Sequence, residues 1–272
     1  MRGMFTAGVM DVMLENGIEF DGAIGVSAGA AFGCNYKSKQ IGRVFRYNAK
    51  YCRNPRFASL LSFILTGNFY GKKFCYRTLP EKLDIFDSKT FQQNPMEFYV
   101  TATDIVSGKP VYTKCENGNC DDLDWFRASA SMPLVSTVVK INGGKYLDGG
   151  IADSVPLKYF QSIGYDKNVV ILTQPDSYIK QINGFLPIIK FVYRKYPQFI
   201  KTVAERHNVY NSTIKYIKEQ ESSGTTFVIR PPQNLEIGAR EKDPENLKRV
   251  YNIGRKTAEE NLEKLKQFLK GE

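Results

Sequence analysis

The segment Ala-Ile-Gly-Val-Ser-Ala-Gly, residues 23–29, constrains the fold more than any other part of this 272-residue chain. It begins as a short apolar run typical of a buried strand, and the small residues after the serine predict a tightly packed helix. Ser27 would then occupy a sharp strand-to-helix turn that exposes its hydroxyl group, while Gly25 and Gly29 leave room for the turn and for a substrate. Unpaired backbone amides at the start of the helix, from Ala28 onward, could bind the oxyanion of an acyl-transfer intermediate.

A second motif, Asp148-Gly149-Gly150, follows a short predicted strand within residues 127–156. A serine nucleophile needs a base to take its proton. Asp148 is suited to that role because the two glycines allow its loop to pack closely against the serine turn. The alternative interpretation is an ordinary Asp-Gly turn that closes a hairpin.

The chain contains a single histidine, His207, in a polar stretch that favours a helix and has no glycine to bend it toward an active site. A solvated surface side chain is the simpler interpretation of this residue. Without an imidazole the base must be a carboxylate held close to the serine hydroxyl, which again favours Asp148. A conventional α/β-hydrolase triad of Ser27, an aspartate and His207 is the second interpretation, because the order of these residues along the chain fits it.

The Gly-x-Ser-x-Gly turn near the N-terminus, followed about 120 residues later by Asp-Gly-Gly, resembles the patatin-like phospholipases. The Thr103-Asp104 pair and the Ala-Ser-Met-Pro block at residues 130–133 also match this family, and the resemblance extends over roughly residues 1–175. It implies a serine acyl hydrolase with Ser27 as nucleophile, Asp148 as base, and no metal or organic cofactor. The residues expected to bind the oxyanion or the substrate are Arg2, Gly3, Gly25, Ala28, Gly29, Gly149 and Gly150.

One part of the family's pattern is absent. The family carries its oxyanion donors in a turn, Gly-Gly-Gly-x-Arg-Gly, after the first strand, whereas this chain starts Met1-Arg2-Gly3 and continues directly into a helix. We therefore expect Gly3 to represent the end of that turn, with Arg2 beside it, and the first strand to be missing. The favoured interpretation is that Met1 is an internal methionine of a longer protein. The other is a catalytically impaired, membrane-binding relative of the fold.

Apolar runs and helical patterns alternate along the chain and predict an α/β fold. With the resemblance, we expect a three-layer patatin-like fold in which helices cover both faces of a mainly parallel central sheet. We expect a catalytic core at residues 1–175 and a mainly helical continuation at 176–272, packed on the same domain. The predicted strands are 23–26, 97–103, 110–114, 168–173 and 226–230, and the predicted helices are 4–15, 28–37, 122–130, 157–163, 186–219 and 244–269.

The cysteine and histidine content limits the chemistry that the chain can support. Its five cysteines, an odd number, argue for a reducing compartment rather than a disulfide framework. Because the chain has one histidine and no Cys-x-x-Cys pair, no zinc site is predicted. No signal peptide is visible in the sequence as given. We expect a cytoplasmic protein that can lie peripherally at the inner face of the membrane.

Positive charge is concentrated in two segments. Residues 37–80 contain ten Lys or Arg and no Asp or Glu, and residues 177–204 contain five Lys or Arg and again no acid. Both segments interleave these cations with apolar and aromatic side chains, as expected for a surface that meets anionic lipid headgroups. Ordinary helices with solvated basic faces are the alternative. No nucleic-acid-binding motif accompanies the charge, so we expect no nucleic-acid partner.

The sequence thus predicts an enzyme that cleaves fatty-acyl ester bonds of lipids, phospholipids foremost, through an acyl-enzyme on Ser27. Its expected partners are the lipid substrate and an anionic membrane surface.

Overall fold

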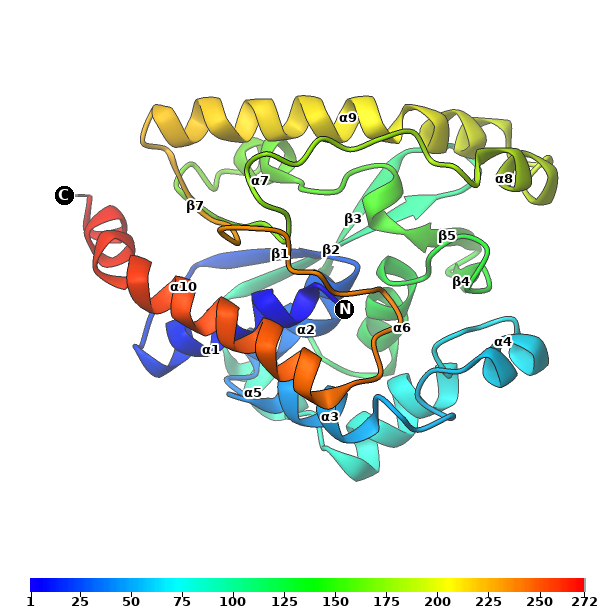
Figure 1. Ribbon diagram of the computed structural model, residues 1–272, viewed down its shortest axis with the longest axis horizontal. Helices are drawn as coiled ribbons and strands as arrows, with labels where there is room; N and C mark the ends of the chain where they lie inside the picture. The colour runs from blue at the N-terminus through cyan, green and yellow to red at the C-terminus, as the bar shows by residue number, and fades with distance from the viewer. Residues whose placement is uncertain (272) are drawn as a thin grey trace.

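Seven strands form two sheets, and helices cover both faces of them (Figure 1). The computed structural model describes residues 1–271. The larger sheet contains β1 (Gly22–Val26), β2 (Glu97–Asp104), β3 (Pro110–Cys115), β4 (Val139–Ile141) and β5 (Gly144–Asp148). The smaller sheet contains β6 (Asn168–Ile171) and β7 (Thr226–Ile229).

The strand β2 is the centre of the larger sheet. It pairs with β1 in parallel, and with β3 and β5 in antiparallel fashion, while β4 pairs with β5. The register places Thr101 of β2 opposite Val26, at the end of β1, and Ala102 opposite Asp148, at the end of β5. The last residue of β1 and the last residue of β5 are therefore brought to neighbouring positions on the same strand.

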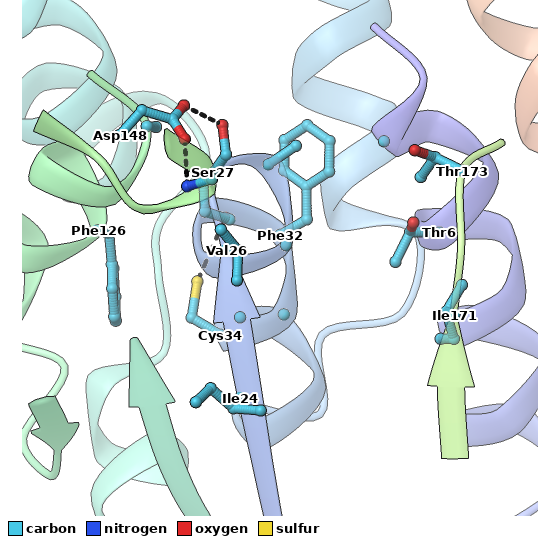
Figure 2. A pocket seen from close by; sticks show the side chains of 18 of the residues that line it. Thr6, Ile24, Val26, Ser27, Phe32, Cys34, Phe126, Asp148, Ile171 and Thr173 are labelled. Atoms are coloured by element: carbon cyan, nitrogen blue, oxygen red, sulfur yellow. Dashed lines mark hydrogen bonds between the residues drawn. The ribbon is translucent and has the colours of Figure 1, made fainter. Parts of the chain in front are cut away.

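Helices lie on both sides of these sheets, with α9 and α7 on one side and α1, α2 and α10 on the other (Figure 1). Strands β6 and β7 pair in parallel, and Figure 2 shows β6 and β1 pointing the same way. The predicted three-layer α/β fold is confirmed. The helices are α1 (Gly3–Glu15), α2 (Ala28–Lys37), α3 (Arg43–Tyr51), α4 (Leu60–Thr66), the π-helix η1 (Phe74–Leu83), α5 (Ser88–Gln93), α6 (Cys120–Ser129), the 3₁₀ turn η2 (Gly149–Ile151), α7 (Leu157–Ser162), α8 (Leu186–Val192), α9 (Pro197–Ser222) and α10 (Pro244–Lys270).

The C-terminal helix α10 packs directly against α1. A Cβ atom on Gly8 would lie 2.1 Å from the carbonyl oxygen of Tyr251, and one on Gly254 would lie 2.1 Å from that of Phe5. Glycine at these two positions therefore lets the two helix backbones approach closely. Buried side chains of α10, including Leu247, belong to the same apolar core as those of α1.

One predicted helix, residues 186–219, is wrong, because the structure divides it into α8 and α9. The break lies just before Pro197, which opens α9. Proline has no amide hydrogen and excludes the α conformation from the residue before it, so it suits the first turn of a helix and not the interior. Tyr196 accordingly has an extended φ of −127°. Ile189 of α8 belongs to one buried cluster with Phe199 and Val203 of α9, while other apolar side chains of α8 stay exposed.

A large cavity separates the two sheets. Strand β1 uses one edge to pair with β2, and β6 uses one edge to pair with β7; among residues 1–271 no strand pairs with the edges that face each other. The cavity measures about 1170 Å³ and is lined by both of these strands. Figure 2 shows Ile24 and Val26 on one side of it and Ile171 and Thr173 on the other.

No helix within residues 1–271 combines the length and the apolar character needed to cross a bilayer.

Candidate active site

Ser27 occupies the turn between β1 and α2, as predicted. Its backbone has φ 55° and ψ −117°, a conformation that non-glycine residues rarely adopt and that costs of the order of 1–3 kcal/mol. Gly25 makes the turn possible, since a Cβ atom there would lie 2.5 Å from the carbonyl oxygen of Gly29. Strain at this one serine is compatible with a functional role, because it aims the hydroxyl group out of the turn.

Neighbouring groups hold the serine turn in place. The amide of Ser27 donates a hydrogen bond to Oγ of Ser129, 2.8 Å away at the end of α6. The carbonyl oxygen of Ser27 accepts the amides of Ala30 and Ala31, which starts α2. The amides of Ala28 and Gly29 precede these first helical bonds, at the end where a helix has donors available for an anion.

Asp148 lies directly beside the serine hydroxyl. Oγ of Ser27 donates to Oδ2 of Asp148 over 2.6 Å, a short distance typical of a bond to a carboxylate (Figure 2). The other carboxylate oxygen accepts the amide of Gly150 at 2.8 Å. The backbone of Asp148 is fixed as well, since its carbonyl oxygen accepts the hydroxyl of Thr103 and its amide donates to Ser131.

The first glycine after Asp148 explains why this loop fits against β2. A Cβ atom on Gly149 would lie 2.1 Å from the carbonyl oxygen of Thr101, so the loop backbone touches the strand directly. The second glycine, Gly150, offers its amide to the carboxylate and its carbonyl oxygen to Arg206. The pair of glycines thus positions the carboxylate against the serine turn, as the sequence predicted.

Burial raises the pKa of Asp148 above its ordinary value, because the charged carboxylate loses its contact with water. The hydrogen bond from Ser27, the positive charge of Arg206 and the amide of Gly150 act in the opposite direction. The carboxylate is therefore a stronger proton acceptor than an exposed aspartate, while these three groups stabilise its ionised form.

Most of the predicted site residues line the cavity between the two sheets. The predicted residues on its wall, besides Ser27 and Asp148, are Arg2, Gly3, Gly25, Ala28, Gly29 and Gly150. Gly149 lies behind the wall, against β2. Gly3 packs onto the serine turn, since a Cβ atom there would lie 2.9 Å from Cβ of Ala28. The start of α1 therefore lies next to the start of α2.

His207 lies apart from this arrangement. Nδ1 of its ring is 3.0 Å from the carbonyl oxygen of Ala204, in its own helix. Among the described residues, no hydrogen bond joins it to Ser27 or Asp148.

Three residues that contribute to the site were missed in the sequence. Ser129 supports the serine turn, Thr103 supports Asp148, and Arg206 of α9 donates from Nε to the carbonyl oxygen of Gly150 over 2.5 Å. Ser129 lies in a run of small residues, Ala-Ser-Ala-Ser, which could have suggested close packing. Arg206 had no such signal, because only the folded chain brings α9 to this loop.

The comparison with protein families agrees with this geometry. The family model described as Patatin-like phospholipase matches residues 1–160, which include both motifs and more than half of the chain. The chain belongs to the patatin-like phospholipase family. This patatin-like chain is accordingly a lipid acyl hydrolase, as the sequence predicted. A second model, a domain of unknown function (DUF6363), matches residues 196–270, which hold α9, β7 and α10.

Several relatives of this patatin-like protein are known. It is 28% identical to the uncharacterized protein YjjU of Escherichia coli, covering 93% of this chain and 72% of that protein. It is 24% identical to the lysophospholipase nte1 of Aspergillus terreus, over 97% of this chain and 18% of that protein. It is 27% identical to the uncharacterized NTE family protein Rv1063c of Mycobacterium tuberculosis, over 62% of this chain and 45% of that protein. The chain thus spans less than half of the last two.

Proposed function

We propose that the protein hydrolyses the acyl esters of phospholipids with a dyad of Ser27 and Asp148. The observation that carries this proposal is the 2.6 Å hydrogen bond from the serine hydroxyl to the buried carboxylate. The raised pKa of Asp148 suits a group that accepts a proton during the reaction. The relative named as a lysophospholipase supports a phospholipid as substrate.

In the proposed reaction Asp148 takes the hydroxyl proton of Ser27 while Oγ attacks the ester carbonyl. The negative charge that develops on the carbonyl oxygen is stabilised by backbone amides at the start of α2, beginning with Ala28, and by the adjacent amide of Gly3. The protonated Asp148 then gives its proton to the departing alkoxide, which leaves as the alcohol. In the second half, Asp148 takes a proton from water while the water oxygen attacks the acyl carbonyl. The bond to Oγ of Ser27 then breaks, the fatty acid leaves, and Asp148 returns its proton to Oγ.

We further propose that the enzyme works while docked on an anionic membrane. Two groups of exposed apolar side chains, on α4 and around α8, lie at the same end of the molecule (Figure 1). The cavity reaches both segments, through Asn68 and Lys72 next to α4 and through Phe185 and Ile189 at α8. The exposed apolar residues are Leu60, Leu61, Ile64, Leu65, Ile182, Phe185, Ile188, Phe191 and Val192.

The charge around these side chains favours an anionic surface. Both groups lie within the two acid-free segments, 37–80 and 177–204. Each cation near an anionic bilayer contributes roughly 1 kcal/mol, and the apolar side chains can enter the headgroup region. A docked molecule would therefore present the mouth of the cavity to the lipid.

The substitution Ser27→Ala tests the proposed nucleophile. We expect it to abolish both ester hydrolysis and labelling by a fluorophosphonate probe, with almost no change in thermal midpoint, since only one oxygen is removed. Ser136→Ala is the matched control, because Ser136 lines the same cavity. Labelling that persists on another serine in the Ser27→Ala protein would rule out Ser27 as the nucleophile.

A further inference from the structure

Three cationic side chains gather on the cavity wall beside the serine turn. Arg2 precedes α1, Arg206 comes from α9, and Lys180 comes from the segment between β6 and α8; all three line the cavity, together with Tyr210. Arg206 is anchored by its bond to the carbonyl oxygen of Gly150. Lys180 is held with Nζ over the ring of Tyr210, 4.6 Å from its centre. These contacts place a fixed group of positive charge next to the loop of Asp148.

The backbone around Lys180 is also held in place. Its amide donates to Oδ1 of Asn211, and its carbonyl oxygen accepts Nδ2 of the same asparagine. Asn211 lies on α9, one turn after the residue pair Arg206 and His207. The segment that carries Lys180 is therefore docked on α9 by two hydrogen bonds, and the lysine is positioned and not merely solvated.

These three positive charges outnumber the nearby carboxylate of Asp148. Among residues 1–271, no ion pair includes Arg2, Lys180 or Arg206. Burial and the nearby charges of Arg206 and Arg2 lower the pKa of Lys180 to about 8. Asp148 is the carboxylate that acts on Arg206, and it is already bonded to Ser27 and Gly150. Unbalanced, partly buried charges of one sign favour an anionic ligand.

We propose that Arg2, Lys180 and Arg206 form a subsite for the phosphate group of a glycerophospholipid whose acyl ester lies at Ser27. This inference rests on the proposed function and names the part of the substrate that the site recognises. The guanidinium groups can each offer two parallel donors to phosphate oxygens, and the lysine adds a point charge. Arg206 bonds to Gly150, which follows Asp148 by two residues in the chain. A phosphate bound by Arg206 would therefore lie near the ester at Ser27, and the glycerol would span the distance between the phosphate and the ester.

The subsite depends on the C-terminal part of the chain. Lys180 and Arg206 lie outside residues 1–160, the part that matches the patatin-like model, and Arg206 lies in the segment that matches DUF6363. The nucleophile and base thus come from one segment, and most of the phosphate subsite comes from another. This arrangement assigns α9 a role in substrate selection.

The substitution Lys180→Met tests the subsite, because it removes the charge and keeps the length of the side chain. We expect kcat/KM for a lysophosphatidylglycerol to fall by at least about tenfold, through a higher KM, the scale of a lost charged hydrogen bond. Hydrolysis of a monoacylglycerol with the same acyl chain should stay within twofold. Lys215→Met, at an exposed position on α9 outside both acid-free segments, is the matched control and should change the hydrolysis of neither substrate. Equal losses on both substrates, or no loss on either, would overturn the subsite.

A binding measurement separates this inference from the proposed reaction. Calorimetry should show that the wild-type protein binds an ether lysophospholipid, which has no ester, at least about tenfold more tightly than the corresponding alkylglycerol, and that Lys180→Met removes this preference. Inorganic phosphate should bind more weakly than the ether lipid. Equal affinity for phosphate alone would point to free phosphate as the ligand and overturn the lipid assignment. If Ser27→Ala still cleaves esters while the binding preference holds, the proposed reaction fails and the subsite stands.

Discussion

The Nε atom of Arg206 donates a hydrogen bond to the carbonyl oxygen of Gly150 over 2.5 Å, and so joins helix α9 to the loop that carries Asp148. A residue in the last third of the chain thereby influences the group that we propose as the base. Its positive charge lowers the pKa of Asp148, which burial raises. The charge state of the candidate active site is set by both parts of the chain, although the Gly-x-Ser-x-Gly and Asp-Gly-Gly motifs lie in only one of them.

The first prediction concerns the pH dependence of activity, which should reflect the effect of Arg206 on the pKa of Asp148. If Asp148 is the base, activity is present above its pKa in the folded protein and is lost as pH falls through that value. Burial raises this pKa, so the acidic limb of kcat/KM should lie above the ordinary range of an aspartate. Arg206→Gln removes a charge that opposes the rise, and we expect the limb to move to still higher pH.

The pH profile should be measured with a neutral ester, so that loss of the phosphate subsite does not contribute. Arg206→Lys is the matched control: it keeps the charge, and its acidic limb should stay near that of the wild type. If the acidic limb of kcat/KM lies at the same pH in Arg206→Gln as in the wild type, this arginine supports the loop without changing the pKa of Asp148.

The second prediction separates the dyad from the triad. Asp148→Asn should lower kcat by at least about 10²-fold, the usual scale for removal of a general base. His207→Ala should leave kcat within a few-fold, because the ring bonds to Ala204 in its own helix. The opposite result, a small loss for Asp148→Asn and a large one for His207→Ala, would favour the triad.

Asp148→Asn should also change how the stability of the protein depends on pH. A carboxyl group whose pKa is raised on folding binds its proton more tightly in the native state, so its ionisation destabilises the fold as pH rises. The variant lacks this ionisation. We expect its thermal midpoint to equal or exceed that of the wild type at pH 7, and this advantage to disappear in acid. A lower midpoint at pH 7 would show that the ionised carboxylate stabilises the turn.

The turn of Ser27 and the loop of Asp148 could be predicted from the sequence because each motif is local. The conformation of Ser27 depends on its immediate neighbours, and the loop of Asp148 depends on the two glycines that follow it. The residues that were missed act across the fold. Arg206 reaches Gly150, which is 56 residues away in the chain, so no short pattern could have shown the contact.

The helix prediction failed for a related reason. The apolar spacing of residues 186–192 continues the pattern of the helix that follows, and this periodicity concealed the break before Pro197. Several short elements were also missed, including α3, α4 and the π-helix. Helix α3 and the π-helix bury side chains such as Val44 and Leu79, so tertiary contacts outweigh a weak local preference there. Helix α4 buries none of its residues and begins at Ser59, whose side chain accepts the amide of Ser62.

The third prediction distinguishes the two glycines of the serine motif. Gly25→Ala should destabilise the protein by about 1–3 kcal/mol, because its Cβ atom would overlap the backbone of Gly29 and Ala30. Gly29→Ala should leave stability unchanged or raise it slightly, since no atom lies within 4 Å of that Cβ position and alanine favours a helix. Chemical denaturation of both variants checks this, and equal effects would contradict it.

The fourth prediction concerns membrane docking. Leu65 and Phe191 are 73% and 72% exposed, so Leu65→Glu and Phe191→Glu should hardly affect folding. Each should weaken sedimentation with phosphatidylglycerol vesicles by roughly tenfold, because an apolar side chain is lost from the interface. Ile85→Glu is the control, at a residue 66% exposed that does not line the cavity. Wild-type binding should weaken with salt. Equal binding to neutral and anionic vesicles at every salt concentration would exclude the electrostatic part.

The fifth prediction concerns the cavity between β1 and β6. Both strands turn an edge toward it, and the backbone groups on such edges favour pairing with an added strand. Gly3 packs against Ala28 at the carboxyl end of β1, so a strand that ran parallel to β1 could continue directly into α1. An engineered extension of roughly ten residues ahead of Met1, one strand followed by three glycines, should therefore occupy the part of the cavity between β1 and β6.

The extension should raise stability and activity together. New hydrogen bonds to β1 and β6 should slow amide exchange in both strands, and a gain of 1–2 kcal/mol would raise the thermal midpoint by roughly 4 °C. The glycine turn would add amide donors near Ser27, and each oxyanion donor is worth about 10²–10³ in rate. A matched extension with two prolines in the strand, which cannot pair, should give neither gain.

If the extension protects both strands but abolishes hydrolysis, the cavity holds the acyl chain of the substrate. Full activity of residues 1–272 would show that the amides of Gly3 and Ala28 suffice for the oxyanion.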